Sequence, residues 1–205
     1  MELATLNPEN TVYLFDFDGT LTRQELLPLI AEELGCFDEI QDLTLKTLNG
    51  EINFFESFRR RVEILSSAPL SLISDIISRV ELRPCFVDFI TANSSNCKIV
   101  TGNLDLWIND ATKTLGVEVF SSKGIVKEDG TVGISQILDK STIAARFSGM
   151  RTIMFGDSAN DASLMRRCDV GIAVGIAHLP PHSILEVCSV LILSEKQISN
   201  VIRRL

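Results

Sequence analysis

Two aspartates one residue apart, Asp16 and Asp18, follow a short apolar run over residues 12–15. Because successive side chains on an extended backbone alternate between faces, both carboxylates can point to the same side. Carboxylates held that close repel each other, and one takes up a proton unless a cation lies between them. A hard divalent ion with oxygen ligands, Mg²⁺ above all, removes this conflict. An acidic turn at Asp18-Gly19 is the alternative interpretation.

A second acidic group follows another apolar run, residues 153–155. Gly156 permits a tight turn there, and Asp157 stands at the end of its run as Asp16 does. Asp161 comes four residues after Asp157, one helical turn away, so it can face the same side. The alternative is an ordinary capped helix start, because Asp, Ser and Asn all cap helices well.

Two further stretches have the residue types of a phosphate site. Thr101, Gly102 and Asn103 offer in succession a hydroxyl, an unhindered backbone N–H and an amide, which together suit a phosphate. Taken alone, they are more typical of an N-cap for a helix beginning at Leu104. Lys140 stands at the start of a predicted helix, where the helix dipole disfavours a cation. A solvated surface lysine is the alternative there.

The polar groups follow apolar runs that alternate with helical patterns, and this alternation predicts a three-layer, doubly wound parallel α/β sheet. The expected strands are residues 12–15, 98–100, 117–120, 152–155, 170–174 and 190–193, and the expected helices are residues 85–92, 104–115, 140–147, 160–167 and a last one from 195. Glu128-Asp129-Gly130 between two β-rich runs predicts a hairpin within residues 123–133. Ligands of such sheets bind beyond the carboxyl ends of the strands, so the polar groups should converge there.

Residues 24–79 have a different pattern, with apolar residues at helical spacing and no strand among them. Gly35, Asn49-Gly50 and Pro69 separate four short helices, and Pro84 marks the return to the alternating pattern. This segment predicts a small helical bundle inserted after the first strand. The predicted division is a catalytic α/β core of residues 1–21 and 84–205 and a helical cap of residues 22–83.

The composition bounds the class of protein. The 205 residues suffice for one sizeable core with a small subdomain, and 45% hydrophobic with 22% charged residues indicates a globular chain. A net charge of −8 argues against a nucleic-acid partner. Five cysteines without a CxxC pair favour reduced thiols in a cytoplasm. Residues 1–5 lack the basic start and continuous apolar stretch of a signal peptide, and the apolar segment 170–177 is too short for a membrane span, so we expect a soluble intracellular protein. The oligomeric state stays open.

Taken together, these motifs resemble those of the haloacid dehalogenase superfamily. The motifs that carry the resemblance are Asp16-Phe17-Asp18-Gly19-Thr20, Thr101-Gly102, Lys140 and Gly156-Asp157-Ser158-Ala159-Asn160-Asp161. They occur in order and span essentially the whole chain. The resemblance implies a Mg²⁺-dependent phosphomonoester hydrolase that forms an aspartyl-phosphate on a small phosphorylated metabolite.

The resemblance also implies a role for each residue. Asp16 would be the nucleophile and Asp18 the general acid and base. Thr101, Gly102, Asn103 and Lys140 would bind the phosphate. The expected metal site comprises Asp16, Asp18 through its carbonyl, Asp157 and Asp161, the last of these holding either Lys140 or a metal-bound water.

The predicted helical bundle resembles the small cap of phosphoserine phosphatases. Glu25 matches the glutamate that meets the substrate ammonium, and Arg61 matches the arginine that meets the substrate carboxylate. Phe54 is expected as an apolar wall and Asn160 as a further substrate contact. This resemblance implies O-phospho-L-serine as substrate, and hence serine biosynthesis. A solvated helical face containing Glu25 and residues 59–61 is the alternative.

The sequence departs from the phosphoserine phosphatases at one motif, because Thr101-Gly102-Asn103 stands where they usually carry Ser-Gly-Gly. The stretch between Lys140 and Asp157 is also shorter than usual. Three alternatives stay open. They are a phosphatase for another small phosphate ester, a phosphotransferase that passes the phosphoryl group to an alcohol, and a non-catalytic binding module.

Overall fold

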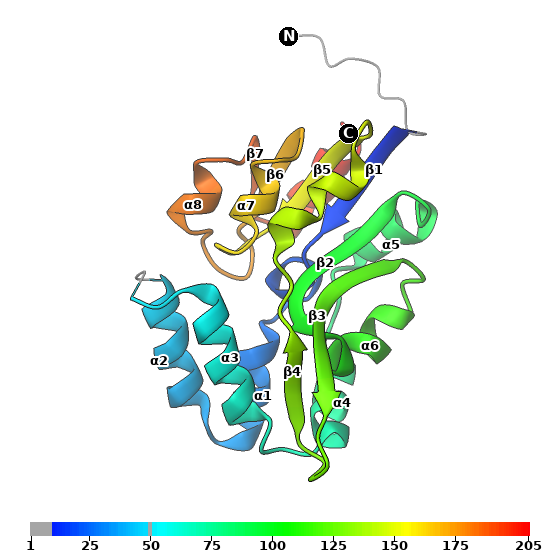
Figure 1. The fold of residues 1–205 in the computed structure, drawn as a ribbon. Helices are drawn as coiled ribbons and strands as arrows, with labels where there is room; N and C mark the ends of the chain where they lie inside the picture. Colours follow the sequence, from blue (N-terminus) through cyan, green and yellow to red (C-terminus); the bar gives the residue numbers. More distant parts are fainter. Residues whose placement is uncertain (1–9, 49–50) are drawn as a thin grey trace.

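A seven-stranded sheet forms the centre of the computed structural model, which describes residues 10–48 and 51–205. The strands are β1 (Thr11–Phe15), β2 (Cys97–Leu104), β3 (Glu118–Val126), β4 (Val132–Gln136), β5 (Arg151–Gly156), β6 (Val170–Val174) and β7 (Val190–Ile192). Their order is β4-β3-β2-β1-β5-β6-β7, and every neighbouring pair is parallel except β3 with β4 (Figure 1). The predicted parallel sheet and hairpin are confirmed.

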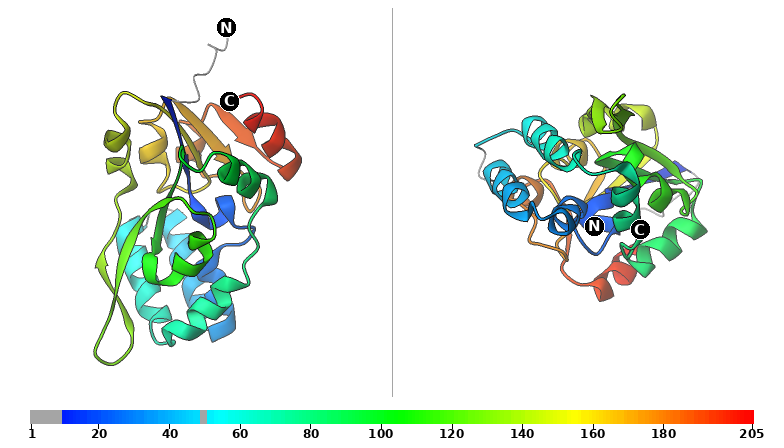
Figure 2. Two further views of the ribbon diagram at one scale, coloured as in Figure 1. Left: turned by 90° about the vertical axis from the view of Figure 1, so that its right-hand side faces the viewer. Right: turned by 90° about the horizontal axis from the view of Figure 1, so that it is seen from below.

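Helices cover both faces of this sheet, which explains the uninterrupted apolar sequence of β1. Val12 and Leu14 pack toward one face, whereas Tyr13 and Phe15 pack toward the other, because side chains alternate along a strand. Short helices α7 (Ala162–Met165) and α8 (His182–Leu185) lie on the first face. On the second face lie α5 (Pro84–Ala92), α6 (Asp105–Lys113) and α9 (Glu195–Ile202). The predicted three layers are therefore present (Figure 2).

Four helices follow β1 and lie beyond its carboxyl end (Figure 1). They are α1 (Leu26–Leu34), α2 (Phe37–Leu48), α3 (Phe54–Leu65) and α4 (Leu70–Ser78). Gly35 ends α1 in the left-handed conformation (φ +71°), and Pro69 directly precedes α4, as predicted. The predicted break at Asn49-Gly50 lies outside the described residues. No helix among the described residues is long and apolar enough to cross a membrane.

Two predicted helices are wrong in extent. Residues 140–147 form two separate turns, Lys140–Thr142 and Ala144–Phe147, in place of one α-helix. The helix expected from residue 160 begins only at Ala162, because the Asp161 carboxylate accepts hydrogen bonds from the backbone N–H groups of Asp157 and Ser158. Strand β2 is longer than expected and includes the Thr101-Gly102-Asn103 stretch, with a register shift between Thr101 and Leu104.

The chain enters and leaves the four helices side by side, through an antiparallel bridge between Thr22 and Leu82. Beside this bridge, Arg83 is almost fully buried. Its Nε donates to the Thr20 carbonyl at 3.1 Å, and its Nη1 lies 2.8 Å from Glu195 at the start of α9. The Glu195 carboxylate also pairs with Arg23 at 3.1 Å. The Glu195 carboxylate thus holds both the entering and the returning segment against the start of α9.

We expect Glu195→Ala to lower the free energy of unfolding by about 2–3 kcal/mol, because it leaves the buried Arg83 guanidinium without its ion-pair partner. The measurement is chemical denaturation. Glu186→Ala is the matched control, since the Glu186 carboxylate pairs with the exposed His182 and with no other residue that the structure describes. Its effect should stay within about 0.5 kcal/mol. Equal losses for the two variants would contradict the structural role of Glu195.

Candidate active site

The acidic groups meet at the carboxyl ends of β1, the central strand, and its neighbour β5. Phe15 pairs with Phe155, and the backbone N–H of Asp16 donates to the Phe155 carbonyl at 2.8 Å, so the ladder continues up to Asp16. Carboxylate oxygens of Asp16, Asp157 and Asp161 all lie within 4.8 Å of one another, and all three residues are buried. We call these three residues the acidic cluster.

Lys140 lies inside this arrangement, so it is not a surface lysine. Its Nζ is 2.7 Å from Asp16 Oδ1 and 2.6 Å from Asp161 Oδ1, and only 3% of the residue is exposed. Burial lowers the pKa of Lys140, but the two carboxylates raise it by more, so the net pKa is higher than usual. The lysine is therefore a fixed positive charge next to Asp16.

Asp161 acts on Lys140 and on the backbone. While its Oδ1 accepts from Lys140, its Oδ2 accepts from the N–H groups of Asp157 and Ser158 at 3.2 and 3.1 Å. A Cβ atom on Gly156 would lie only 2.7 Å from Asp161 Cγ, so the side chain takes this position only because residue 156 is glycine. Both Asp161 oxygens are thus engaged within the protein.

The acidic cluster holds more negative charge than Lys140 neutralises. Burial, and then Asp161, raise the pKa of Asp16 well above its usual range, although Lys140 acts in the opposite direction. Burial raises the pKa of Asp157 to about 6, against the lowering effect of a hydrogen bond from His178. Buried carboxylates in this state are stabilised by a bound cation. Their oxygen donors fit a hard divalent ion such as Mg²⁺.

The Asp18 carboxylate points away from this cluster, toward the beginning of α1. Its Oδ1 accepts from the Leu26 N–H at 2.7 Å, and its Oδ2 accepts from Asn103 Nδ2 at 3.3 Å. Burial and the neighbouring Glu25 carboxylate raise the pKa of Asp18 well above its usual range. A raised pKa favours the protonated carboxyl group, which is the form that general acid catalysis requires.

The Thr101-Gly102-Asn103 stretch does not cap helix α6. The Asn103 side chain donates to Asp18, and the Thr101 hydroxyl accepts from the Asn103 N–H at 3.2 Å, while α6 begins after Leu104 without a side-chain cap. A Cβ atom on Gly102 would lie 2.9 Å from Phe54 Cζ and 3.2 Å from Asn160 Nδ2. Gly102 is therefore where the helical segment and the Asn160 loop meet the end of β2.

Of the three consecutive arginines in α3, only Arg61 faces the site. Arg59 is exposed and Arg60 pairs with Glu56 on the surface, so the solvated-face interpretation applies to these two. Arg61 is half-buried, and burial lowers its pKa although Asp18 and Glu25 raise it. Its Nε donates to the backbone of its own helix, and its guanidinium forms no ion pair with the residues that the structure describes.

Sequence reasoning missed His178, which lies in the loop after β6. Its Nε2 is 2.8 Å from Asp157 Oδ2 and 3.2 Å from Glu25 Oε1, and its Nδ1 is 3.0 Å from the Leu179 carbonyl oxygen. Hydrogen bonds to Asp157 and Glu25 raise the pKa of His178 to about 11. The available signal was its place just beyond the carboxyl end of a predicted strand.

Sequence reasoning also gave no role to Thr20. Its hydroxyl donates to Asp157 Oδ1 at 2.9 Å, and its backbone carbonyl accepts from Arg83. Thr20 therefore connects the acidic cluster to the segment that returns from the four helices.

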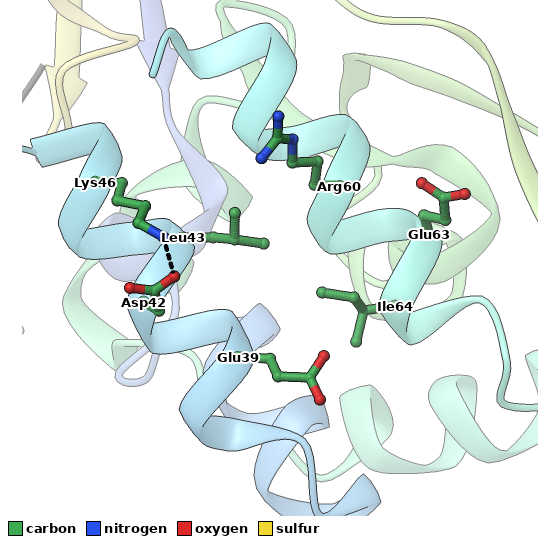
Figure 3. A pocket seen from close by; sticks show the side chains of 7 residues that line it. All are labelled: Glu39, Asp42, Leu43, Lys46, Arg60, Glu63 and Ile64. Atoms are coloured by element: carbon green, nitrogen blue, oxygen red, sulfur yellow. Dashed lines mark hydrogen bonds and ion pairs between the residues drawn. The ribbon is translucent and has the colours of Figure 1, made fainter. Parts of the chain in front are cut away.

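A pocket of about 440 Å³ lies elsewhere, between α2 and α3 (Figure 3). Its lining residues are Glu39, Asp42, Leu43, Lys46, Arg60, Glu63 and Ile64. Both cations of the lining already have carboxylate partners, Asp42 for Lys46 and Glu56 for Arg60. None of the predicted site residues lines this pocket, so it is separate from the acidic cluster.

Comparison with known families identifies the family of the chain. A family model described as haloacid dehalogenase-like hydrolase matches residues 13–166, and a second model of that description matches residues 136–202. The chain belongs to the haloacid dehalogenase-like hydrolases. Its predicted family is therefore confirmed.

This haloacid dehalogenase-like hydrolase is similar to known phosphatases over most of its length. It is 27% identical to the phosphoserine phosphatase of Methanocaldococcus jannaschii over 186 residues, 82% of this chain and 87% of the relative. A structure described as a phospho-aspartyl intermediate analogue of phosphoserine phosphatase has a TM-score of 0.77 and 26% identity, covering 93% of this chain and 97% of that one. The T. onnurineus phosphoserine phosphatase in complex with NDSB-201 has a TM-score of 0.78 and 25% identity, with 98% and 99% covered. The chain is thus an enzyme, a phosphatase of this family.

We expect Mg²⁺ to raise the melting temperature of the metal-free enzyme, because a divalent cation offsets the excess charge of the acidic cluster. At one hundred times its Kd, bound Mg²⁺ adds about 2.7 kcal/mol, which is roughly 5–11 °C for a domain of this size. Differential scanning calorimetry at constant ionic strength measures the shift. Asp157→Asn should abolish it, whereas Asp110→Asn, on the exposed surface of α6, should retain it. A full shift in Asp157→Asn would contradict metal binding at the cluster.

Proposed function

We propose that the chain is a Mg²⁺-dependent phosphomonoester hydrolase that cleaves O-phospho-L-serine through an aspartyl-phosphate on Asp16. The observation that carries this proposal is the state of the Asp16 carboxylate. Its Oδ1 accepts from Lys140 at 2.7 Å and from the Phe17 N–H at 2.8 Å. Its Oδ2 makes no hydrogen bond with the described residues and is free to attack phosphorus. The similarity to a phospho-aspartyl intermediate analogue of phosphoserine phosphatase supports this assignment.

In the first step, Asp16 Oδ2 forms a bond to phosphorus as the bond to the serine oxygen breaks. Asp18 gives its proton to the departing alkoxide, which the raised pKa of its carboxyl group allows. In the second step, Asp18 takes a proton from the water that attacks the aspartyl-phosphate, and Asp16 is released. Mg²⁺ held by Asp16 and Asp157 would supply charge neutralisation between the carboxylate and the phosphoryl group.

The charge of the phosphoryl oxygens requires fixed donors on the protein. Lys140 is held in place by Asp161 and brings a permanent positive charge beside Asp16. The Thr101 hydroxyl and the Gly102 N–H would donate from the end of β2. Because these groups are already oriented, they stabilise the transition state without reorganising.

The amino-acid end of the substrate would lie between the sheet and residues 22–83, which we propose act as a cap. Arg61 would bind the carboxylate in a bidentate manner, and Glu25 would bind the ammonium. Phe54 and Asn160, which approach the Gly102 position, would line the space between them. The phosphoserine phosphatases among the relatives support this choice of substrate.

Asp16→Asn should lower phosphate release by more than about a thousandfold, because an amide cannot act as the nucleophile. The assay measures Mg²⁺-dependent phosphate release from O-phospho-L-serine, and circular dichroism verifies that the variant is folded. Asp110→Asn, with the same chemical change on the surface, should be fully active. Residual activity above a thousandth in Asp16→Asn would argue against a covalent aspartate.

Arg61→Ala should lower kcat/KM for phosphoserine roughly 10- to 100-fold, because the substrate carboxylate loses its charge-assisted hydrogen bonds to the guanidinium. Turnover of an aryl phosphate, which has no carboxylate, should change less than about twofold. Arg59→Ala, two residues away on the exposed side of α3, is the matched control and should change neither. If phosphoserine is an ordinary substrate of the wild type and Arg61→Ala changes nothing, the enzyme acts on another small phosphate ester.

A further inference from the structure

His178 connects the sheet to the segment that carries the four helices. The imidazole comes from the loop after β6, whereas Glu25 directly precedes α1. The 3.2 Å between Nε2 and Glu25 Oε1 is a direct contact between these two parts of the chain, and the same nitrogen lies 2.8 Å from Asp157 Oδ2. The Leu179 carbonyl, 3.0 Å from Nδ1, fixes the plane of the ring. The histidine is therefore held from the core side and reaches toward Glu25.

The three side chains converge over a glycine. A Cβ atom on Gly19 would lie 2.4 Å from Asp157 Oδ2 and 3.0 Å from Glu25 Oε1, so these carboxylates can approach only above a residue without a side chain. Both ring nitrogens of His178 face oxygens that only accept hydrogen bonds, so both nitrogens donate.

We propose that His178 is a positioning residue for substrate recognition, which holds the Glu25 carboxylate where it meets the ammonium group of an amino-acid phosphate. This inference rests on the function proposed above. His178 engages Oε1 of Glu25 and leaves Oε2 without a hydrogen bond to the described residues. A glutamate with flexible side-chain torsions is thereby ordered before the substrate arrives, and less freedom is lost on binding.

The test compares two esters that differ only in the amino group, O-phospho-L-serine and 3-phosphonooxypropionate. We expect His178→Ala to raise KM for phosphoserine about tenfold with kcat within about twofold, and to leave both constants for the deaminated ester unchanged. His178→Gln, whose amide nitrogen can take the place of Nε2, should restore most of the loss. His182→Ala, the other histidine of the chain and exposed, is the matched control.

The double variant Glu25→Gln with His178→Ala tells whether the two residues act together. We expect it to lose no more than Glu25→Gln alone, because His178 acts through Glu25. Additive losses would overturn the proposal. So would an equal loss on both esters, or a shift in the Mg²⁺ concentration for half-activation, since either result means that His178 acts through Asp157. A wild type that treats the two esters alike would instead reject phosphoserine as the substrate, and the proposal with it.

Discussion

The buried ion pairs of Lys140 constrain the rest of the site. A buried lysine without a partner would lose its proton, and buried carboxylates without a partner would gain one. The lysine and the carboxylates therefore stay charged only as ion pairs. Lys140 contacts Asp16, which follows β1, and Asp161, which follows β5. Both strands and the turn at residue 140 must therefore be in place together. Such a network gains little stability over an apolar core, but loss of one partner would leave a buried charge uncompensated.

The acidic cluster and the attachment of the helical segment share one short turn. Residues 17–21 carry Gly19, which makes room for Asp157, and Thr20, which donates to Asp157 and accepts from Arg83. Arg83 is in turn held by Glu195 on the far side of the chain crossing. A displacement of the helices therefore reaches the acidic cluster through two side-chain contacts. The position of the helical segment and the geometry of the acidic cluster are therefore coupled through this turn.

The strands could be predicted from the sequence. A strand of a parallel sheet is buried on both faces, so it appears in the sequence as a short uninterrupted apolar run. The Asp16-Phe17-Asp18 motif also indicated its position at a strand end. The prediction of one helix over residues 140–147 was wrong. Lys140 is positioned by its ion pairs with Asp16 and Asp161, which are distant in sequence, and the local spacing of apolar residues cannot reveal such partners. His178 was missed for the same reason, since its partners are 21 and 153 positions away in sequence.

The net charge of −8 raises the question of how an acidic protein binds an anion. At physiological salt the charges of the outer surface are screened beyond about 8 Å, so they contribute little inside a closed site. What a phosphate ester would meet there is local: Lys140 beside Asp16, the N–H groups at the end of β2, and Arg61 on α3. Lys140 and Arg61 come from different parts of the fold, one inside the acidic cluster and one on the helical segment. In the proposed substrate, the phosphate would meet Lys140 and the carboxylate would meet Arg61, so each anionic end would have its own cation.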